Sequence, residues 1–217
     1  MILNTLIVIL FIVIASIDIY AIKKGKIKIR YFTKPLLIPF LLFYYYLSAA
    51  NINPSIIAAL TFCFLGDFFL LFTGNHGFLL AGLVSFFSGH IFYAIVFLNT
   101  TCFLTDVPLW FYFSLIPYIF FGKFMYNKLN PYIQSLRIPV LVYLIAILFM
   151  GFSCFTRIWG IQGYAFWLPF AGSLAFIVSD TLLAIRTFKY KINHGWISIM
   201  ILYLSAQTLI ISGLLNS

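Results

Sequence analysis

Two aspartates lie in segments that otherwise have the character of membrane-buried helix. Asp67 lies in "FLGDFFLLF" and Asp180 in "LAFIVSDTLLAIRTF". An ionisable group inside a bilayer costs free energy, so it is usually functional and faces the interior of a helix bundle. Two carboxyls held close together differ in proton affinity, so that one can act as a general acid and the other as a base. The structural alternative is that each aspartate only hydrogen-bonds a neighbouring tyrosine, glutamine or lysine.

Other polar side chains in the apolar segments are candidates for supporting roles: Lys34, His90, Tyr93, Ser179, Tyr203 and Gln207. His90 and Tyr93 fall on one stripe of their predicted helix, and Tyr203 and Gln207 are four residues apart and hence neighbours on a helix face. Small residues beside the polar ones are expected to let helices approach closely: Gly66, Gly89, Gly172, Ser173 and Ser179.

The composition predicts an all-α integral membrane protein. Of the 217 residues, 64% are hydrophobic and only 8% are charged, which is too apolar for a water-soluble domain of this length. The apolar segments are about 20 residues long, as helices that cross a ~30 Å hydrocarbon core must be. They lack the ten-residue alternation of an outer-membrane barrel.

Eight transmembrane helices fit the hydropathy pattern within one domain over residues 1–217. The apolar N-terminus is interpreted as a first span and not as a removable signal peptide. The predicted spans form one bundle over residues 2–22, 34–50, 54–73, 77–98, 106–127, 137–155, 164–187 and 194–215.

The distribution of basic residues predicts the orientation. The segment "KKGKIKIRYFTK" after the first span holds six of the 13 lysines and arginines. With the eight spans above, six others lie on the same side, and Arg157 alone lies on the opposite side. The positive-inside rule then places the basic loops in the cytoplasm and both termini outside, in a bacterial inner (plasma) membrane. Since topology explains the net charge of +9, a nucleic-acid partner is not predicted.

The predicted spans place the two aspartates at similar depth. Asp67 is six residues and Asp180 seven residues from the predicted cytoplasmic end of its span, which corresponds to about 10 Å. Lys34 enters the bilayer from the same boundary, so the three side chains are able to meet.

A faint internal similarity accompanies this arrangement. "GDFFLL" resembles "SDTLLA", and the same interval of 23 residues separates Asp67 from His90 and Asp180 from Tyr203. Two parallel four-helix halves give such a pattern. We treat the repeat as a hypothesis.

Several common sites are not indicated, and no metal or cofactor is predicted. The three cysteines form no CxxC motif, and three histidines as scattered as His76, His90 and His194 do not suggest the converging ligands of a zinc hydrolase. Serine-hydrolase elbows and nucleotide-binding glycine loops are absent from the sequence. Asp18 and Asp106 are expected to be structural, with Asp18 reaching toward Lys23 and Lys24.

The order of these segments resembles the YhhN-like family of eight-span membrane proteins, which includes the lysoplasmalogenases. The resemblance covers roughly residues 30–215. It rests on "TKPLLIPF", "GDFFLLF", "GLVSFFSGHIFYAIVF", "AGSLAFIVSDTLLAIRTF" and "YLSAQTLIISG". It implies hydrolysis of the vinyl ether bond of a lysophospholipid in the bilayer, which yields a fatty aldehyde and glycerophospho-ethanolamine or -choline. The matching polar positions are Lys34, Asp67, His90, Tyr93, Ser179, Asp180, Tyr203 and Gln207.

If the protein hydrolyses a vinyl ether, Asp67 and Asp180 are predicted to be the catalytic acid and base, in either order. Burial in lipid-like surroundings favours the protonated carboxyl that a general acid requires. Lys34 is expected either to hold the phosphate of the substrate or simply to snorkel. Three alternatives remain: a proton- or cation-coupled transporter of a small molecule or lipid, a hydrolase of another ether lipid, and a non-catalytic lipid-binding protein.

Overall fold

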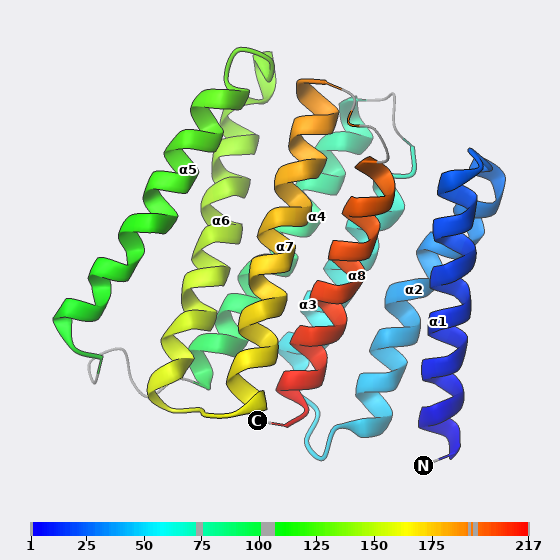
Figure 1. The fold of residues 1–217 in the computed structure, drawn as a ribbon, viewed down its shortest axis with the longest axis horizontal. Helices are drawn as coiled ribbons and strands as arrows, with labels where there is room; N and C mark the ends of the chain where they lie inside the picture. Colours follow the sequence, from blue (N-terminus) through cyan, green and yellow to red (C-terminus); the bar gives the residue numbers. More distant parts are fainter. Residues whose placement is uncertain (1, 73–75, 101–106, 191, 193–194, 217) are drawn as a thin grey trace. The chain divides into compact units, whose positions relative to one another are not determined.

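The computed structural model describes residues 2–72, 76–100, 107–190, 192 and 195–216, and all regular structure in these ranges is helical (Figure 1). Three short 3₁₀ segments occur: η2 (Leu109–Ser114), η3 (Gln134–Leu136) and η4 (Arg157–Trp159). The α-helices are α1 (Ile2–Lys23), α2 (Ile27–Ser48), α3 (Pro54–Phe69), α4 (His76–Asn99), α5 (Leu115–Leu129), α6 (Arg137–Thr156), α7 (Tyr164–Phe188) and α8 (Gly195–Leu214).

The helices group into two compact units, residues 1–89 and residues 90–217. The boundary falls inside α4, between Gly89 and His90, and not in a loop. The first unit contains α1, α2, α3 and the first part of α4, and the second contains the rest of α4 with α5 to α8. The prediction of a single transmembrane domain stays a prediction.

The chain is a helical membrane protein, as its composition predicted. Five helices are long and apolar enough to cross a membrane: α1, α4, α6 together with η4, α7 and α8. The apolar helix α3 has only 16 residues. All eight predicted segments contain helix, but the number of true crossings stays a prediction.

The basic segment predicted as a loop after the first span is mostly helix. The chain turns at Gly25, which has a φ of 65° that suits glycine, and α2 begins at Ile27 instead of residue 34. Buried Asp18 of α1 explains the early start, since its Oδ1 accepts a hydrogen bond from Thr33 Oγ1 (2.7 Å) and lies 3.7 Å from Arg30 Nε. The expectation that Asp18 reaches toward Lys23 and Lys24 is therefore wrong, and its structural role stays a prediction that these contacts fit.

The sequence predicted that Asp67 and Asp180 lie about equally far from the ends of their helices, but in the structure these two distances differ. α3 ends at Phe69 and not at residue 73, because Leu71 and Phe72 donate short-range bonds to Phe68 and Phe69 in a tight turn. Asp67 consequently lies in the last turn of α3, whereas Asp180 lies about two turns before the end of α7.

The fifth predicted span also begins differently. Its predicted first residue, Asp106, lies outside the described residues, and the described part starts with the 3₁₀ segment η2 before α5. Pro117 lies in the first turn of α5 and has no N–H to donate to the carbonyl of Phe113. The α-helical bonding pattern therefore becomes regular only after this point.

Small residues bring helices close together within each unit, as the sequence predicted. In the first unit, a Cβ placed on Gly66 would lie 2.5 Å from the ring of Phe86. In the second, a Cβ on Gly172 would lie 2.8 Å from the carbonyl oxygen of Ala206. Glycine at position 172 thus lets the backbones of α7 and α8 come into contact, and Figure 1 shows these two helices side by side.

Candidate functional site

In the first unit, the buried polar residues Lys34 and Asp67 form an ion pair between α2 and α3. Lys34 Nζ lies 3.0 Å from Asp67 Oδ1, and the two side chains are 8% and 4% exposed. Lys34 continues the buried stripe of α2 that includes Ile38 and Leu41, which directs its side chain inward. An ion pair requires an ionised carboxyl, so this contact suits Asp67 to act as a carboxylate.

In the second unit, a hydrogen-bonded cluster surrounds one oxygen of Asp180. The hydroxyl of Tyr143 on α6 donates to Asp180 Oδ2 of α7. His90 Nε2 of α4 lies 3.3 Å from the same oxygen and 3.0 Å from the hydroxyl oxygen of Tyr143. Three helices therefore contribute to one polar cluster, in which His90 is completely buried and Asp180 is 8% exposed.

The acceptors around His90 indicate which nitrogen of the neutral ring carries the proton. Asp180 Oδ2 is an acceptor, and the Tyr143 hydroxyl already donates to it, so both groups next to Nε2 offer lone pairs. A neutral His90 is accordingly protonated on Nε2. Its Nδ1 is then an acceptor, and this buried atom has no hydrogen-bond partner among the described residues.

Three further predicted residues, Tyr93, Tyr203 and Gln207, lie in the same unit. The Tyr93 hydroxyl of α4 donates to Gln207 Oε1 of α8 over 2.6 Å, and both residues are fully buried. The ring of Phe176 meets the rings of His90 and Tyr203 edge to face, with centroids 4.8 Å and 5.4 Å away. Phe176 of α7 thus packs against both His90 of α4 and Tyr203 of α8.

Ser179 has a different role from its neighbour Asp180. Its hydroxyl donates to the carbonyl oxygen of Ile199 over 3.0 Å, which ties α7 to α8. This bond uses the serine for helix packing, the role that small polar residues often have between membrane helices.

The predicted site residues are therefore found in two groups. Lys34 contacts Asp67 in the first unit, while His90 contacts Asp180 and Tyr93 contacts Gln207 in the second. Asp67 and Asp180 belong to different units, and their pairing stays a prediction. The contact between Lys34 and Asp67 agrees with the possibility, drawn from the sequence, that these side chains meet, while phosphate binding and snorkelling by Lys34 stay predictions.

Sequence reasoning missed Tyr143. The protein has 14 tyrosines, and no motif distinguishes this one. A signal was nevertheless present in the spacing. Tyr143 is six residues from the basic end of the predicted span 137–155, and Asp180 is seven residues from the same end of its own span. Comparison of depths across the spans makes Tyr143 one candidate partner of Asp180.

The other ionisable residues considered in the sequence lie apart from these clusters or outside the described residues. His76 begins α4 and is exposed, while Asp106, Cys102 and His194 lie outside the described ranges. Among the residues that the structure describes, no three His, Cys, Asp or Glu side chains converge in the manner of metal ligands.

Comparison with known proteins gives one match. The sequence profile of the YhhN family matches residues 29–214, a range that includes both polar clusters. No curated protein and no solved structure matches the chain.

Proposed function

Because the chain belongs to the YhhN family, we propose that it is a membrane hydrolase that cleaves the vinyl ether bond of lysoplasmalogens. The products are a fatty aldehyde and glycerophospho-ethanolamine or glycerophosphocholine. The observation that carries the proposal is the Asp180 carboxyl, which is buried and bonded through one oxygen to Tyr143 and His90.

The chemistry of vinyl ether hydrolysis needs an acid and then a base. A general acid donates a proton to the outer vinyl carbon, which leaves an oxocarbenium-like cation at the carbon that bears the ether oxygen. Water adds to this carbon and loses a proton, and the resulting hemiacetal collapses to aldehyde and alcohol. Glycosidases pass through a similar cation with two carboxyls, one of which is the acid.

The contacts of the two aspartates favour different roles. Asp67 is paired with the Lys34 ammonium, so we assign it the ionised role, in which it stabilises the cation and takes the proton from water. Asp180 Oδ2 accepts hydrogen bonds from Tyr143 and His90, which fix the orientation of its carboxyl group. Because Asp67 takes the ionised role, we assign Asp180 the role of the acid.

The remaining residues position these groups. Tyr143 and His90 fix the orientation of the Asp180 carboxyl through the contacts described above. Tyr93 holds the amide of Gln207, whose buried Nε2 has no hydrogen-bond partner among the described residues. We propose that this amide, as a donor, and His90 Nδ1, as an acceptor, take part in orienting the attacking water.

The first test is aldehyde release from lysoplasmenyl-ethanolamine by the purified protein in detergent. We expect aldehyde and glycerophosphoethanolamine in equal amounts, since each turnover yields one of each. A hydrolase needs no sealed compartment, whereas a transporter acts only across a closed vesicle with a gradient. Absence of aldehyde, together with gradient-dependent uptake by proteoliposomes, would replace the hydrolase with a transporter.

Replacement of Tyr143 by phenylalanine tests the positioning of Asp180. The change removes one hydrogen bond to the carboxyl and keeps the ring, so we expect kcat to fall about tenfold with little change in KM. Stopped-flow detection of aldehyde gives both constants. Tyr118→Phe is the matched control, because Tyr118 also lies in the second unit and its hydroxyl donates to the Gly151 carbonyl over 3.4 Å. Equal kcat for Tyr143→Phe and the parent would contradict a positioning role.

A further inference from the structure

A second feature of the unit formed by residues 90–217 lies away from the polar cluster. An apolar groove of about 460 Å³ runs between α5 and α6, which lie side by side in Figure 1. The groove has the size of a small-molecule site. Its lining residues are Leu115, Tyr118, Ile119, Gly122, Lys123 and Tyr126 of α5 and Leu141, Leu144, Ile145, Leu148 and Phe149 of α6.

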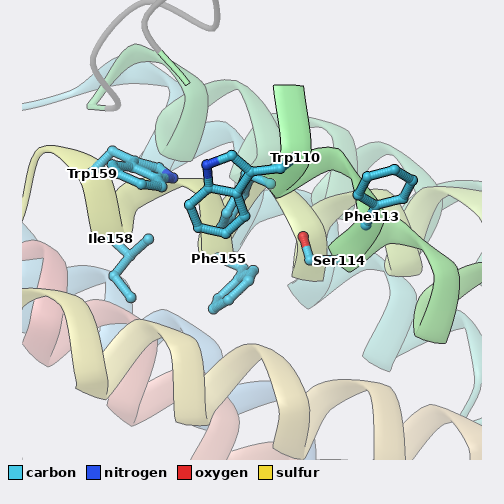
Figure 2. Close-up of a pocket in the computed structure, with 7 residues that line it drawn as sticks. Trp110, Phe113, Ser114, Phe155, Ile158 and Trp159 are labelled. Carbon is cyan, nitrogen blue, oxygen red and sulfur yellow. The ribbon is translucent and has the colours of Figure 1, made fainter. Parts of the chain in front are cut away.

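A second cavity of about 640 Å³ lies at the other end of the same pair of helices (Figure 2). It is lined by residues of η2, by Phe155 near the end of α6 and by Ile158 and Trp159 of η4. The rings of Trp110 and Trp159 meet edge to face there, 5.8 Å apart. Ser114 lines this cavity and Leu115, the next residue, lines the groove. The two hollows therefore follow one another along η2 and α5, and we call this continuous line of apolar space the seam.

Local sequence brings α5 and α6 together at one point of this groove. A Cβ on Gly122 would lie 2.8 Å from Leu148 Cδ1, so glycine at this position lets Leu148 of α6 approach α5. Large side chains of the same helix point away from the protein, with Phe120 72% exposed and Phe124 54% exposed. The apolar side chains that line such a groove lose dispersion contacts unless hydrocarbon fills it, because these contacts need atoms on both sides.

Charge distinguishes the two ends of the groove. Among its lining residues, Lys123 is the one that carries a full charge, and Tyr126 lies beside it one turn later. From Lys123 back to Leu115 the groove runs about 12 Å along α5, and it is lined by aliphatic and aromatic side chains. The ligand that this pattern fits is an amphiphile with an anion at the Lys123 end and a hydrocarbon chain along the seam.

We propose that the groove between α5 and α6 binds a membrane phospholipid, with one hydrocarbon chain along the seam and its phosphate at Lys123. Lys128 of the same helix is not expected to hold this phosphate. It is not one of the residues that line the groove, and its ammonium lies over the ring of Phe124, 5.6 Å from the centroid. The site does not depend on the proposed hydrolase activity, since none of its residues belongs to the polar clusters.

Native mass spectrometry of the delipidated protein, titrated with palmitoyl-oleoyl phosphatidylglycerol, tests this site. We expect one tightly retained lipid per chain. Lys123→Gln is expected to weaken its retention about fivefold, the effect of one lysine near an anionic phosphate, and Lys128→Gln is expected to change it little. Gly122→Leu places a side chain in the groove and is expected to abolish the tight site.

Palmitoyl-oleoyl glycerol, which has the same chains and no phosphate, is expected to bind the parent protein about as weakly as phosphatidylglycerol binds Lys123→Gln. Equal retention of phosphatidylglycerol by the parent, Lys123→Gln and Gly122→Leu would overturn the proposal. If Gly122→Leu unfolds in detergent, the comparison of Lys123→Gln with Lys128→Gln decides alone. These outcomes concern lipid retention, so they are independent of aldehyde release.

Discussion

Replacement of Asp180 by asparagine is expected to lower the rate of aldehyde release by about 10²- to 10⁴-fold, the range that general acids contribute. Asparagine has the shape of aspartate, and its amide oxygen can still accept from Tyr143 and His90. It cannot donate a proton to the vinyl carbon. The rate per folded protein is measured with lysoplasmenyl-ethanolamine, and circular dichroism confirms the helix content.

Asp18→Asn is the matched control for this experiment. Asp18 is also a buried aspartate on a helix, but it bonds Thr33 and lies near Arg30 of the neighbouring helix. We expect this variant to lose thermal stability and to keep the parental rate per folded molecule. A parental rate in Asp180→Asn would remove Asp180 from the mechanism.

Replacement of Asp67 by asparagine is expected to lower the rate by a similar factor and to destabilise the protein. The ammonium of Lys34 then stays buried opposite an uncharged amide. Removing one partner of a buried ion pair typically costs roughly 3–5 kcal/mol. Thermal unfolding in detergent, followed by circular dichroism, measures this loss beside the assay of aldehyde release.

Lys34→Met separates the two effects of the Asp67 substitution. This variant breaks the same ion pair but keeps the carboxyl, so we expect a comparable loss of thermal stability with at least about tenfold more activity than Asp67→Asn retains. Lys28→Met, at an exposed position of the same helix, is expected to leave both quantities unchanged. If Lys34→Met is as inactive as Asp67→Asn, the ion pair and not the carboxyl is what the reaction requires.

The main features of the fold could be predicted from the sequence. Apolar segments of membrane length specify helices because backbone groups in a bilayer must bond within their own segment, and this requirement acts locally along the chain. The candidate residues Asp67, His90 and Asp180 could be identified for a similar reason. A polar residue in an apolar segment is visible without any knowledge of its neighbours.

Helix boundaries were less predictable where a tertiary contact set them. The basic segment after α1 has the composition of a loop, yet α2 begins at Ile27 and aligns Thr33 with Asp18 of α1. Hydropathy measures transfer of a residue to lipid and takes no account of a partner that neutralises its polarity. A charged residue with a buried partner is therefore misread as a loop residue.

What the sequence by itself determined is the class of the protein, its helical segments, its family resemblance and the set of polar residues in apolar surroundings. The tertiary structure decided the partners of these residues: Lys34 for Asp67, and Tyr143 with His90 for Asp180. It also decided that the seam beside Gly122 stays open between α5 and α6. Partners and gaps depend on how each helix is rotated and where it begins relative to its neighbours. These quantities arise from the packing of whole helices, and no local pattern in the chain encodes them.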